Sequence, residues 1–507
     1  MKQMILCGCA ALTAAALAGS YLAADQGKGL EGATLSTNKN IDEGGIAGGG
    51  EPDVTVSRLG LNSSGSGDDF HYYGSYKAAA WPESMRIRAF SAASTSCNIG
   101  SATAQWISGH SGGSAGKHPV IAQNVYRLLD GKFEQIGQSW LKHSFCAVSE
   151  PTCGDCQSTS CGTLGIGCAD TYWATLNGDQ GDLGPRHEIN PWPAVGVPTH
   201  TASPTFPGGP SGTINGRMQI RQGDIDAGGD NFFEIQYITH DEQYEKRYNN
   251  SSWRPVNLSS TNISGIGSGQ ASVRATEFAM HAWKDADPEV DIVSVDSTDD
   301  VPQGDGRFNV GCRIYDNGDG TWDYEFAVHN MNARRGAQSF KVPLRPGVSV
   351  TNPGFHDVEY HSGDGESGNY DGTDWDVEIT DAYIQWSTTP HADDANANAI
   401  RWGTLYNFRF TADSGPIVAS LTMGLYLPST NGTGDDDVQF FALAPDEVDT
   451  GEPCDADTND DGMVDVTDLT NVILAWGSDD PSADIDGNGV VDVSDLTAVI
   501  LAWGACP

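Results

Sequence analysis

Two stretches near the C-terminus carry the residue types and the spacing of calcium-binding loops. They read DTNDDGMVDVTDLTNVILAWG and DIDGNGVVDVSDLTAVILAWG, and they are identical at 14 of 21 positions. A chain that wraps Ca2+ places oxygen ligands at loop positions 1, 3, 5, 7, 9 and 12, and it needs glycine at position 6 for the sharp turn. These ligand positions hold Asp457, Asn459, Asp461, Met463, Asp465 and Asp468 in the first loop, and Asp484, Asp486, Asn488, Val490, Asp492 and Asp495 in the second.

This donor set predicts two Ca2+ ions, one in each loop. Met463 and Val490, at position 7, are expected to contribute backbone carbonyl oxygens. Without a cation, the acidic groups crowded into one loop repel one another. Asx-rich turns that bind nothing are the alternative interpretation, but a twelve-position pattern that occurs twice, each time before a helix, favours calcium.

A short amphipathic helix is expected to follow each loop and to position it. Its apolar residues recur at i, i+3, i+4 and i+7, as Leu469, Val472, Ile473 and Trp476 and again as Leu496, Val499, Ile500 and Trp503. Neither helix is long enough to be stable alone in water. We therefore expect the two helices to pack face to face and to bury both apolar stripes, with a disulfide between Cys454 and Cys506 joining the ends of the tail.

The tail, residues 454 to 507, resembles a type I dockerin. The resemblance lies in the tandem calcium loops without a preceding helix, Asp at position 12, and the closing Ala-Trp-Gly-x-Cys-Pro. It implies calcium-dependent binding to a cohesin-type module, which anchors the cargo to a scaffold or surface, often in a polysaccharide-degrading assembly. It also implies that positions 10 and 11 of each loop help to select the partner; these are Val466, Thr467, Val493 and Ser494. Valine at position 10 departs from the hydroxyl residue that is usual there.

Charge and the N-terminus indicate an exported protein. The chain has 68 acidic and 27 basic residues, a formal charge of -41, which disfavours nucleic acid and anionic lipid as partners. Residues 1–24 combine Lys2 with a run of small and apolar residues and possible cleavage positions after Ala18 or Ala24, which predicts a secretory signal peptide. No later apolar run is long enough to span a bilayer, so no transmembrane segment is expected after the signal is removed. We expect a secreted, extracellular protein, associated with a cell surface or a complex.

Export makes the cysteines outside the signal peptide candidates for disulfides. Five of them form a cluster, Cys146, Cys153, Cys156, Cys161 and Cys168, and Cys97 and Cys312 lie elsewhere. The pair Cys153-x-x-Cys156 would suit a zinc site in a cytosolic protein, but outside the cell a disulfide-bonded loop is favoured. Seven is an odd number, so one thiol is expected to be free, and the connectivity stays open.

The residues from 51 to 445 predict a mainly β fold. Strand-like runs flank the turn signal Asp130-Gly131, and aromatic residues alternate with polar ones in TWDYEFAVHN, which indicates a half-buried strand. Because no stretch alternates strands with helices, we expect antiparallel β-sandwiches or jelly rolls. We divide the region into a domain at 51–300, with the cysteine cluster, and a sandwich at 301–445; residues 25–50 and 446–453 are expected to be linkers, and 454–507 the calcium module.

No catalytic group can be selected in the β region. Asp357, Glu359 and His361 would project from one side of a strand as a metal or acid/base cluster, but a solvent-facing strand explains them equally. Isolated histidines, among them His118, His143 and His329, are expected to be hydrogen-bonded structural residues. Surface tryptophans could stack on sugar rings, although most are expected in the core.

Two functions therefore remain open for the β region. It binds carbohydrate or cell-surface material as a module displayed by the tail, or it is a polysaccharide-degrading O-glycosyl hydrolase of an extracellular complex. A glycosidase needs two carboxylates at a fixed separation, and the sequence offers too many acidic residues to choose a pair.

Overall fold

The computed structural model describes residues 50–62, 67–107, 116–200, 212–360, 370–445, 456–459, 463–485 and 488–505. Within these ranges all strand pairs are antiparallel, so the prediction of a mainly β protein is confirmed. The expected signal peptide and both expected linkers, apart from Gly50, lie outside the described residues. None of the described helices has the length and apolar character that a membrane span requires.

The first set of sheets contains an 11-stranded sheet, whose main path is β15-β14-β13-β6-β7-β12-β3-β2. A 3-stranded sheet, β1-β4-β10, and the short pair β5-β9 accompany it. The strands are β1 (Val54–Leu59), β2 (Phe70–Tyr76), β3 (Ile87–Ala92), β4 (Ser94–Asn98), β5 (Ala104–Gln105), β6 (Val120–Leu129), β7 (Lys132–Gln138), β8 (Leu141–His143), β9 (Thr163–Leu164), β10 (Ala169–Tyr172), β11 (Leu183–Gly184), β12 (Met218–Arg221), β13 (Asp230–Ile238), β14 (Ser251–Ser259), β15 (Asn262–Gly265) and β16 (Arg274–Ala275).

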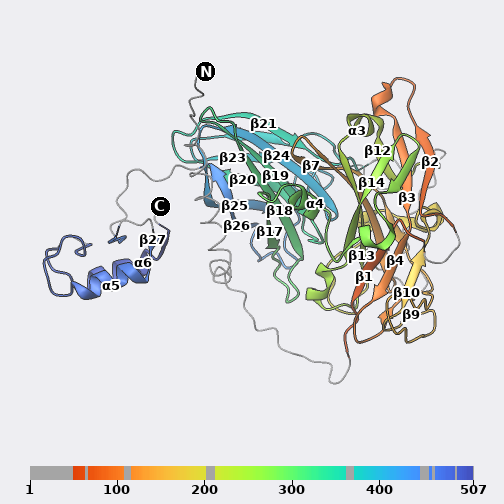
Figure 1. Cartoon of the computed structure of the whole chain (residues 1–507), viewed down its shortest axis with the longest axis horizontal. Helices are drawn as coiled ribbons and strands as arrows, with labels where there is room; N and C mark the ends of the chain where they lie inside the picture. The colour runs from red at the N-terminus through yellow and green to blue at the C-terminus, as the bar shows by residue number, and fades with distance from the viewer. Residues whose placement is uncertain are drawn as a thin grey trace, which may run out of the picture. The chain divides into compact units, whose positions relative to one another are not determined.

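The second set is a sandwich of two 5-stranded sheets, ordered β17-β18-β19-β24-β21 and β22-β23-β20-β25-β26 (Figure 1). Aromatic side chains fill the space between them, including Phe326, Phe340, Trp386 and Phe408. The strands are β17 (Asp291–Asp296), β18 (Arg307–Asp316), β19 (Trp322–Asn330), β20 (Ala337–Pro343), β21 (Val350–His356), β22 (Asp376–Ile379), β23 (Tyr383–Ser387), β24 (Thr404–Ala412), β25 (Pro416–Leu425) and β26 (Asp437–Pro445).

Helices in the β region are short and lie in the connections. They are α2 (Ala174–Asn177), α3 (Gln222–Ala227) and α4 (His281–Ala286), together with the 3-10 turns η1 (Glu83–Met85), η3 (Gln180–Asp182), η4 (Arg186–Glu188), η5 (Tyr244–Tyr248) and η6 (Gly269–Ser272). None of them covers a sheet in the way that the helices of a parallel α/β fold do.

The change from the first set of sheets to the second falls between residues 275 and 291, which differs from the division expected near residue 300. The polar segment around residue 300 joins β17 to β18, and these strands pair from Asp291↔Cys312 to Asp296↔Arg307. Polar, turn-forming residues suit a hairpin connection as well as a domain boundary, which is why composition placed the division too late.

The expected hairpin at Asp130-Gly131 is present. Strands β6 and β7 pair up to Leu129↔Lys132, and the two turn residues have φ of 50° and 76°. Positive φ at both central residues is the geometry of a primed turn, whose twist matches that of the flanking strands.

Strand β19 was expected to be half-buried, and this prediction is wrong. Its aromatic face packs in the sandwich core, but Glu325, Ala327 and His329 on the opposite face are also buried. The reason is that this sheet packs against the first set of sheets through β7. Asn407 Nδ2 donates to Phe133 O over 2.9 Å, and Leu405 N donates to Gln135 Oε1 over 2.7 Å. A polar strand face can therefore be internal when it carries matched hydrogen-bonding groups.

Three disulfides organise the cysteine-rich segment, so the prediction of disulfides is confirmed and zinc at Cys153 and Cys156 is not supported. The pairs are Cys97–Cys153, Cys146–Cys161 and Cys156–Cys168, and the leftover thiol is the buried Cys312. Disulfides of this kind form and persist in oxidising compartments, such as the outside of the cell.

Candidate functional site

The two loop segments of the tail lead into helices of equal length, α5 (Val466–Leu474) and α6 (Val493–Leu501). Each helix begins with a capping box. Asp465 accepts from Thr467 N over 2.6 Å and Asp492 from Ser494 N over 2.8 Å, while Asp468 and Asp495 accept from the backbone N–H of Asp465 and Asp492. These bonds satisfy helix N–H groups that would otherwise lack partners.

The acid at position 12 of each loop also closes the loop. Asp468 Oδ1 accepts from Thr458 N over 2.9 Å, and Asp495 Oδ1 accepts from Ile485 N over 2.7 Å. Both side chains are fully buried, although each is an aspartate on a small module. In the second loop Asp484 accepts from Asn488 N and Gly489 N. The first and last acids of the loop are therefore both directed back onto its backbone.

The described donors fit a hard cation. Carboxylate, amide and carbonyl oxygens are the ligands that Ca2+ prefers, and a buried carboxylate at position 12 gains most from a cation beside it. In the described part of the tail, the expected ligands are Asp457, Asn459, Met463, Asp465, Asp468, Asp484, Asn488, Val490, Asp492 and Asp495. Asp461, Asp486, Cys454 and Cys506 lie outside the described residues.

The two helices bury less than their full apolar stripes, in contrast to the prediction. Val472 and Val499 are fully buried in a shared core with Val464 and Val491. Ile473 and Ile500 are 53% and 56% exposed, and Trp476 and Trp503 are both 52% exposed. Trp476 and Trp503 lie beyond the last residues of α5 and α6, so they are not part of the helical stripes as expected. Nine-residue helices can bury only one narrow ridge against each other, so Ile473 and Ile500 stay at the surface.

A short two-stranded pair joins the two ends of the module. Strand β27 (Met463–Val464) pairs with β28 (Gly504–Ala505) through Met463↔Ala505 and Val464↔Gly504. The expected partner-selecting residues Val466, Thr467, Val493 and Ser494 are all exposed on the first turns of the helices. The tail thus presents the same polar and apolar side chains twice.

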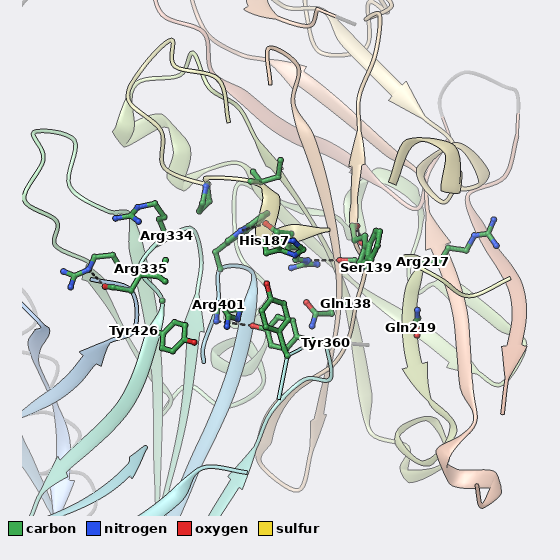
Figure 2. A pocket seen from close by; sticks show the side chains of 18 residues that line it. Gln138, Ser139, His187, Arg217, Gln219, Arg334, Arg335, Tyr360, Arg401 and Tyr426 are labelled. Carbon is green, nitrogen blue, oxygen red and sulfur yellow. Dashed lines mark hydrogen bonds between the residues drawn. The ribbon is translucent and has the colours of Figure 1, made fainter. Parts of the chain in front are cut away.

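A second candidate site lies between the first set of sheets and the sandwich. It is a cavity of about 130 Å3 (Figure 2), and arginine and aromatic side chains dominate its wall: Arg186, Arg217, Arg334, Arg335, Arg401, Trp140, Trp402, Tyr360, Tyr370 and Tyr426. We call it the arginine pocket. Five of only 27 basic residues of an acidic chain lie here.

Arg186 contributes a positive charge that is hydrogen-bonded to neutral oxygen atoms and is also attracted by the Glu234 carboxylate. Its guanidinium donates to the carbonyl oxygens of Ser139, Gln123 and Gly403 at 2.7–3.1 Å and to Asn124 Oδ1 at 2.8 Å. Burial lowers its pKa to about 10, so the group stays charged at neutral pH. Dipolar carbonyls hold the guanidinium in place and leave its net charge in the pocket.

Arg401 is the central cation of the pocket. It lies over the rings of Tyr370, at 4.0 Å from the centroid, and Tyr426, at 5.0 Å, and it donates to Ala395 O and Ala397 O at 3.1 Å. Its backbone N–H donates to Tyr360 Oη (Figure 2). Among the described residues, its Nε is buried without a hydrogen-bond partner.

Arg335 and Arg334 complete one side of the pocket. Arg335 is buried, and its guanidinium donates to Leu427 O, Thr298 O and Asp435 O at 2.7–3.0 Å. The exposed Asp436 approaches the guanidinium at 3.9 Å, and Asp305 accepts from the Arg335 backbone N–H at 2.8 Å. Arg334 is neutralised by Asp299 at 2.7 Å. Uncompensated guanidinium groups in a partly enclosed, low-dielectric site make a positive potential, which favours an anion.

A more acidic cavity of about 380 Å3 adjoins the arginine pocket, since Tyr360 and Tyr370 line both. Burial raises the pKa of Asp357 in its wall to about 7, and Asn398 Nδ2 donates to Asp357 Oδ2 over 2.5 Å. Glu359 pairs with Arg221. The expected strand with Asp357 and Glu359 on one side is wrong, because β21 ends at His356; His361 lies outside the described residues.

Sequence reasoning missed both the arginine pocket and the meeting of His118 with His143. The pocket arginines are spread from residue 186 to 401 and follow no motif. His118 Nε2 lies 2.9 Å from His143 Nδ1, and His200 is beside them, so neither histidine is isolated. Trp192, Trp253, Trp375 and Trp402 are buried, as expected of most tryptophans, and Trp402 also lines the pocket.

Comparisons with known proteins do not place the chain in a family. No family model and no curated protein matches it. Among solved structures, the C-terminal domain of the Streptococcus agalactiae AgI/II polypeptide BspA is 9% identical, with 78% of this chain and 100% of that chain covered and a TM-score of 0.17. The N-terminal domain of the Streptococcus gordonii adhesin Sgo0707 is also 9% identical, with coverage of 78% and 96% and a TM-score of 0.16. Likeness at these TM-scores does not establish a common fold.

Proposed function

We propose that this is an exported protein whose C-terminal calcium module docks onto a cohesin-type partner, and whose β region binds an acidic carbohydrate in the arginine pocket. The observation that carries the docking part is the duplication in the tail. Two loops with calcium-ligand spacing each end in a buried aspartate that folds back onto the loop, and each is followed by a helix with exposed side chains.

Calcium would be held by the side chains at positions 1, 3, 5, 9 and 12 and by the position 7 carbonyls. The ion supplies the positive charge that lets these acids lie together. The chain's own residues then fix the helices, because Asp468 and Asp495 link each loop to the first turn of its helix. An ordered pair of helices presents Val466, Thr467, Val493 and Ser494 as one surface, as partner recognition requires.

The binding part rests on the arginine pocket. An acidic sugar, carrying a carboxylate or sulfate, offers an anion for the guanidinium groups and a ring face for tyrosine and tryptophan. A neutral sugar would leave the charges of Arg186 and Arg401 uncompensated. The pocket is therefore expected to select anionic over neutral saccharides.

Isothermal titration of the exported chain with oligosaccharides tests this binding. We expect uronate-containing or sulfated oligosaccharides to bind and neutral ones of equal length to bind at least about 10-fold more weakly, because charge-assisted hydrogen bonds are among the strong ones. Arg401→Gln should weaken the anionic ligands. The matched control is Arg274→Gln, which also removes an arginine from an aromatic ring, that of Trp253, but outside the pocket. Equal binding of neutral and anionic ligands would contradict the proposal.

An enzymatic role on polysaccharide is the second candidate, and the raised pKa of Asp357 favours it. A carboxyl group with a pKa of about 7 beside a cavity is suited to act as a general acid. Release of reducing ends from a panel of polysaccharides tests this function. If Asp357→Asn abolishes the release and Asp376→Asn, on an exposed strand, retains it, Asp357 is assigned as the catalytic acid. Binding without release leaves the displayed module as the function.

A further inference from the structure

Three histidines from distant parts of the sequence meet inside the first set of sheets. His118 lies two residues before β6, His143 is the last residue of β8, and His200 lies in the connection between η4 and β12. Pairing of β6 with β8 places Val120 opposite His143, which brings the first two side chains together. The third is delivered by a connection that is closed on itself by a bond from Asn190 N to Thr199 O.

The cluster is compact and buried. One ligand atom of each histidine lies within 4.8 Å of the others, and the rings are 4.9–5.4 Å apart between centroids. His118 and His143 are fully buried and His200 is 7% exposed. We call these three residues the histidine triad.

Electrostatics restricts the protonation state of the triad. Three imidazolium cations at this separation in a buried site would repel one another strongly. The 2.9 Å contact between His118 Nε2 and His143 Nδ1 requires one of these nitrogens to accept, so at least one ring is deprotonated there. A neutral imidazole nitrogen is also the form that binds a metal ion.

The spacing suits a tetrahedral ion. Zinc–nitrogen bonds of about 2.0–2.1 Å at tetrahedral angles place ligand nitrogens about 3.3 Å apart. The His118–His143 contact of 2.9 Å is shorter than this spacing, and the limit of 4.8 Å for the three ligand atoms is longer. Small rotations of the rings are therefore enough to place the three nitrogens around one ion. An ion would replace the proton that the two rings now share.

A neighbouring hydroxyl selects the ligand atom of the third ring. Thr199 Oγ1 lies 3.2 Å from His200 Nδ1, so in the proposed site His200 would bind the ion through Nε2. Partners of this kind on the distal nitrogen fix the ring orientation of metal-bound histidines.

We propose that the histidine triad is a binding site for one zinc-class divalent transition metal ion, held by three neutral imidazole nitrogens. This donor set is distinct from the all-oxygen loops of the tail, because borderline-soft ions prefer nitrogen and Ca2+ prefers oxygen. The ion ties the segment that contains His200 to the start of β6 and the end of β8. Its role is to stabilise that connection.

Zinc titration of the full exported chain, stripped with a chelator and then held in saturating calcium, tests the proposal. Calcium is added to keep zinc out of the tail loops. The zinc retained after gel filtration is then counted per chain by mass spectrometry. We expect one tightly bound zinc ion, with affinity at least about 10-fold lower in His143→Gln and in His200→Ala. The control is His71→Gln, a partly exposed histidine paired with Asp68, which should leave zinc binding unchanged. Equal zinc affinity in all variants would overturn the proposal.

A spectroscopic measurement on the unmodified chain covers the case in which the variants fail to fold. X-ray absorption of the zinc-loaded protein should show nitrogen neighbours at about 2.0–2.1 Å with the multiple-scattering pattern of imidazole. A shell of oxygen atoms without imidazole would assign the zinc to surface carboxylates and would refute the histidine site.

Discussion

Arg409, on β24, donates from Nη2 to Oε1 of Glu134, on β7, over 2.9 Å, across the boundary between the two sets of sheets. The same guanidinium pairs with Glu325 on β19 at 2.8 Å. Arg127 also donates to Glu134, over 2.8 Å. These two arginines and two glutamates form one network, which joins β6 and β7 of the first set of sheets to β19 and β24 of the sandwich.

Loss of Arg409 should destabilise this boundary strongly. Arg409→Met leaves Glu134 and Glu325 facing each other with one arginine fewer, and breaking a buried ion pair from one side costs about 3 kcal/mol or more. Denaturant unfolding followed by tryptophan fluorescence measures the change. Arg274→Gln, which removes a surface arginine, should change the free energy of unfolding by less than about 0.5 kcal/mol. Similar values for both variants would show that the network is not a stabilising link.

The stability of the β region should fall as pH rises from mildly acidic to mildly basic. Burial raises the pKa of Glu242 to about 8 and those of Asp170, Asp305 and Glu325 to about 7. Because the folded state keeps these protons where the unfolded chain has lost them, the contribution is complete below about pH 4 and is lost by about pH 8. Glu134 acts oppositely: His356, Arg127 and Arg409 overcome its burial and hold its pKa at about 2, so its contribution is lost only in strong acid.

Denaturant unfolding in constant calcium at about pH 5.5 and about pH 8.5 checks this dependence, and we expect at least about 2 kcal/mol less stability at the higher pH. Asp305→Asn keeps an acceptor for Ser297 Oγ and Arg335 N and should reduce the difference. A free energy of unfolding that is constant or rises with pH would contradict the assignment of protonated buried acids.

Thiol counting should separate the buried cysteine from the disulfides. In the exported chain, a maleimide reagent should not label Cys312 while the protein is folded, because the side chain is buried and burial raises the pKa of its thiol well above the usual value. After denaturation without reductant we expect one labelled cysteine by mass spectrometry. Two additional labels at Cys454 and Cys506 would show that the expected disulfide of the tail is absent.

Calcium removal should release the tail alone. Hydrogen exchange of the full chain, with and without a calcium chelator, is expected to rise in residues 463–505 and to stay unchanged in strands such as β13 and β19, since the expected calcium ligands all lie in the tail. Asp468→Asn and Asp495→Asn together should mimic the chelator. Asp480→Asn is the control, because the Asp480 side chain accepts from the local Ser482 and is not one of the expected loop ligands. Equal protection with and without calcium would refute metal-dependent folding of the tail.

Partner binding should depend on both helices. Thr467→Glu with Ser494→Glu adds a charge to the first turn of each exposed helix face and should reduce calcium-dependent capture by cohesin modules at least about 10-fold, since an unmatched charge in an interface is costly to desolvate. Surface plasmon resonance with a panel of immobilised cohesins measures this. Asn459 and the other loop ligands are unchanged, so calcium affinity, measured separately, serves as the control. If no cohesin of the panel captures the protein in saturating calcium, the proposal of a cohesin-type partner is contradicted.

The sequence by itself determined the features that depend on neighbouring residues. Alternation of apolar and polar residues indicated β strands, and Asp130-Gly131 indicated a hairpin. The repeated pattern of acids and glycine predicted the two tail helices, which are present, and calcium loops before them, which stay a prediction. Cysteine number together with export predicted disulfides and one free thiol, which is Cys312. All of these signals lie within a few residues or in composition.

Tertiary structure alone decided which distant residues meet. Glu325 and His329 look like the solvent face of a strand, yet they are buried because β7 and its neighbours cover them. Arg186 and Arg401 share one pocket, and His118, His143 and His200 share one cluster, although more than 20 residues separate each from the next in the sequence. Strand register and the packing of one sheet against another set these contacts, and a single sequence carries no local pattern for either.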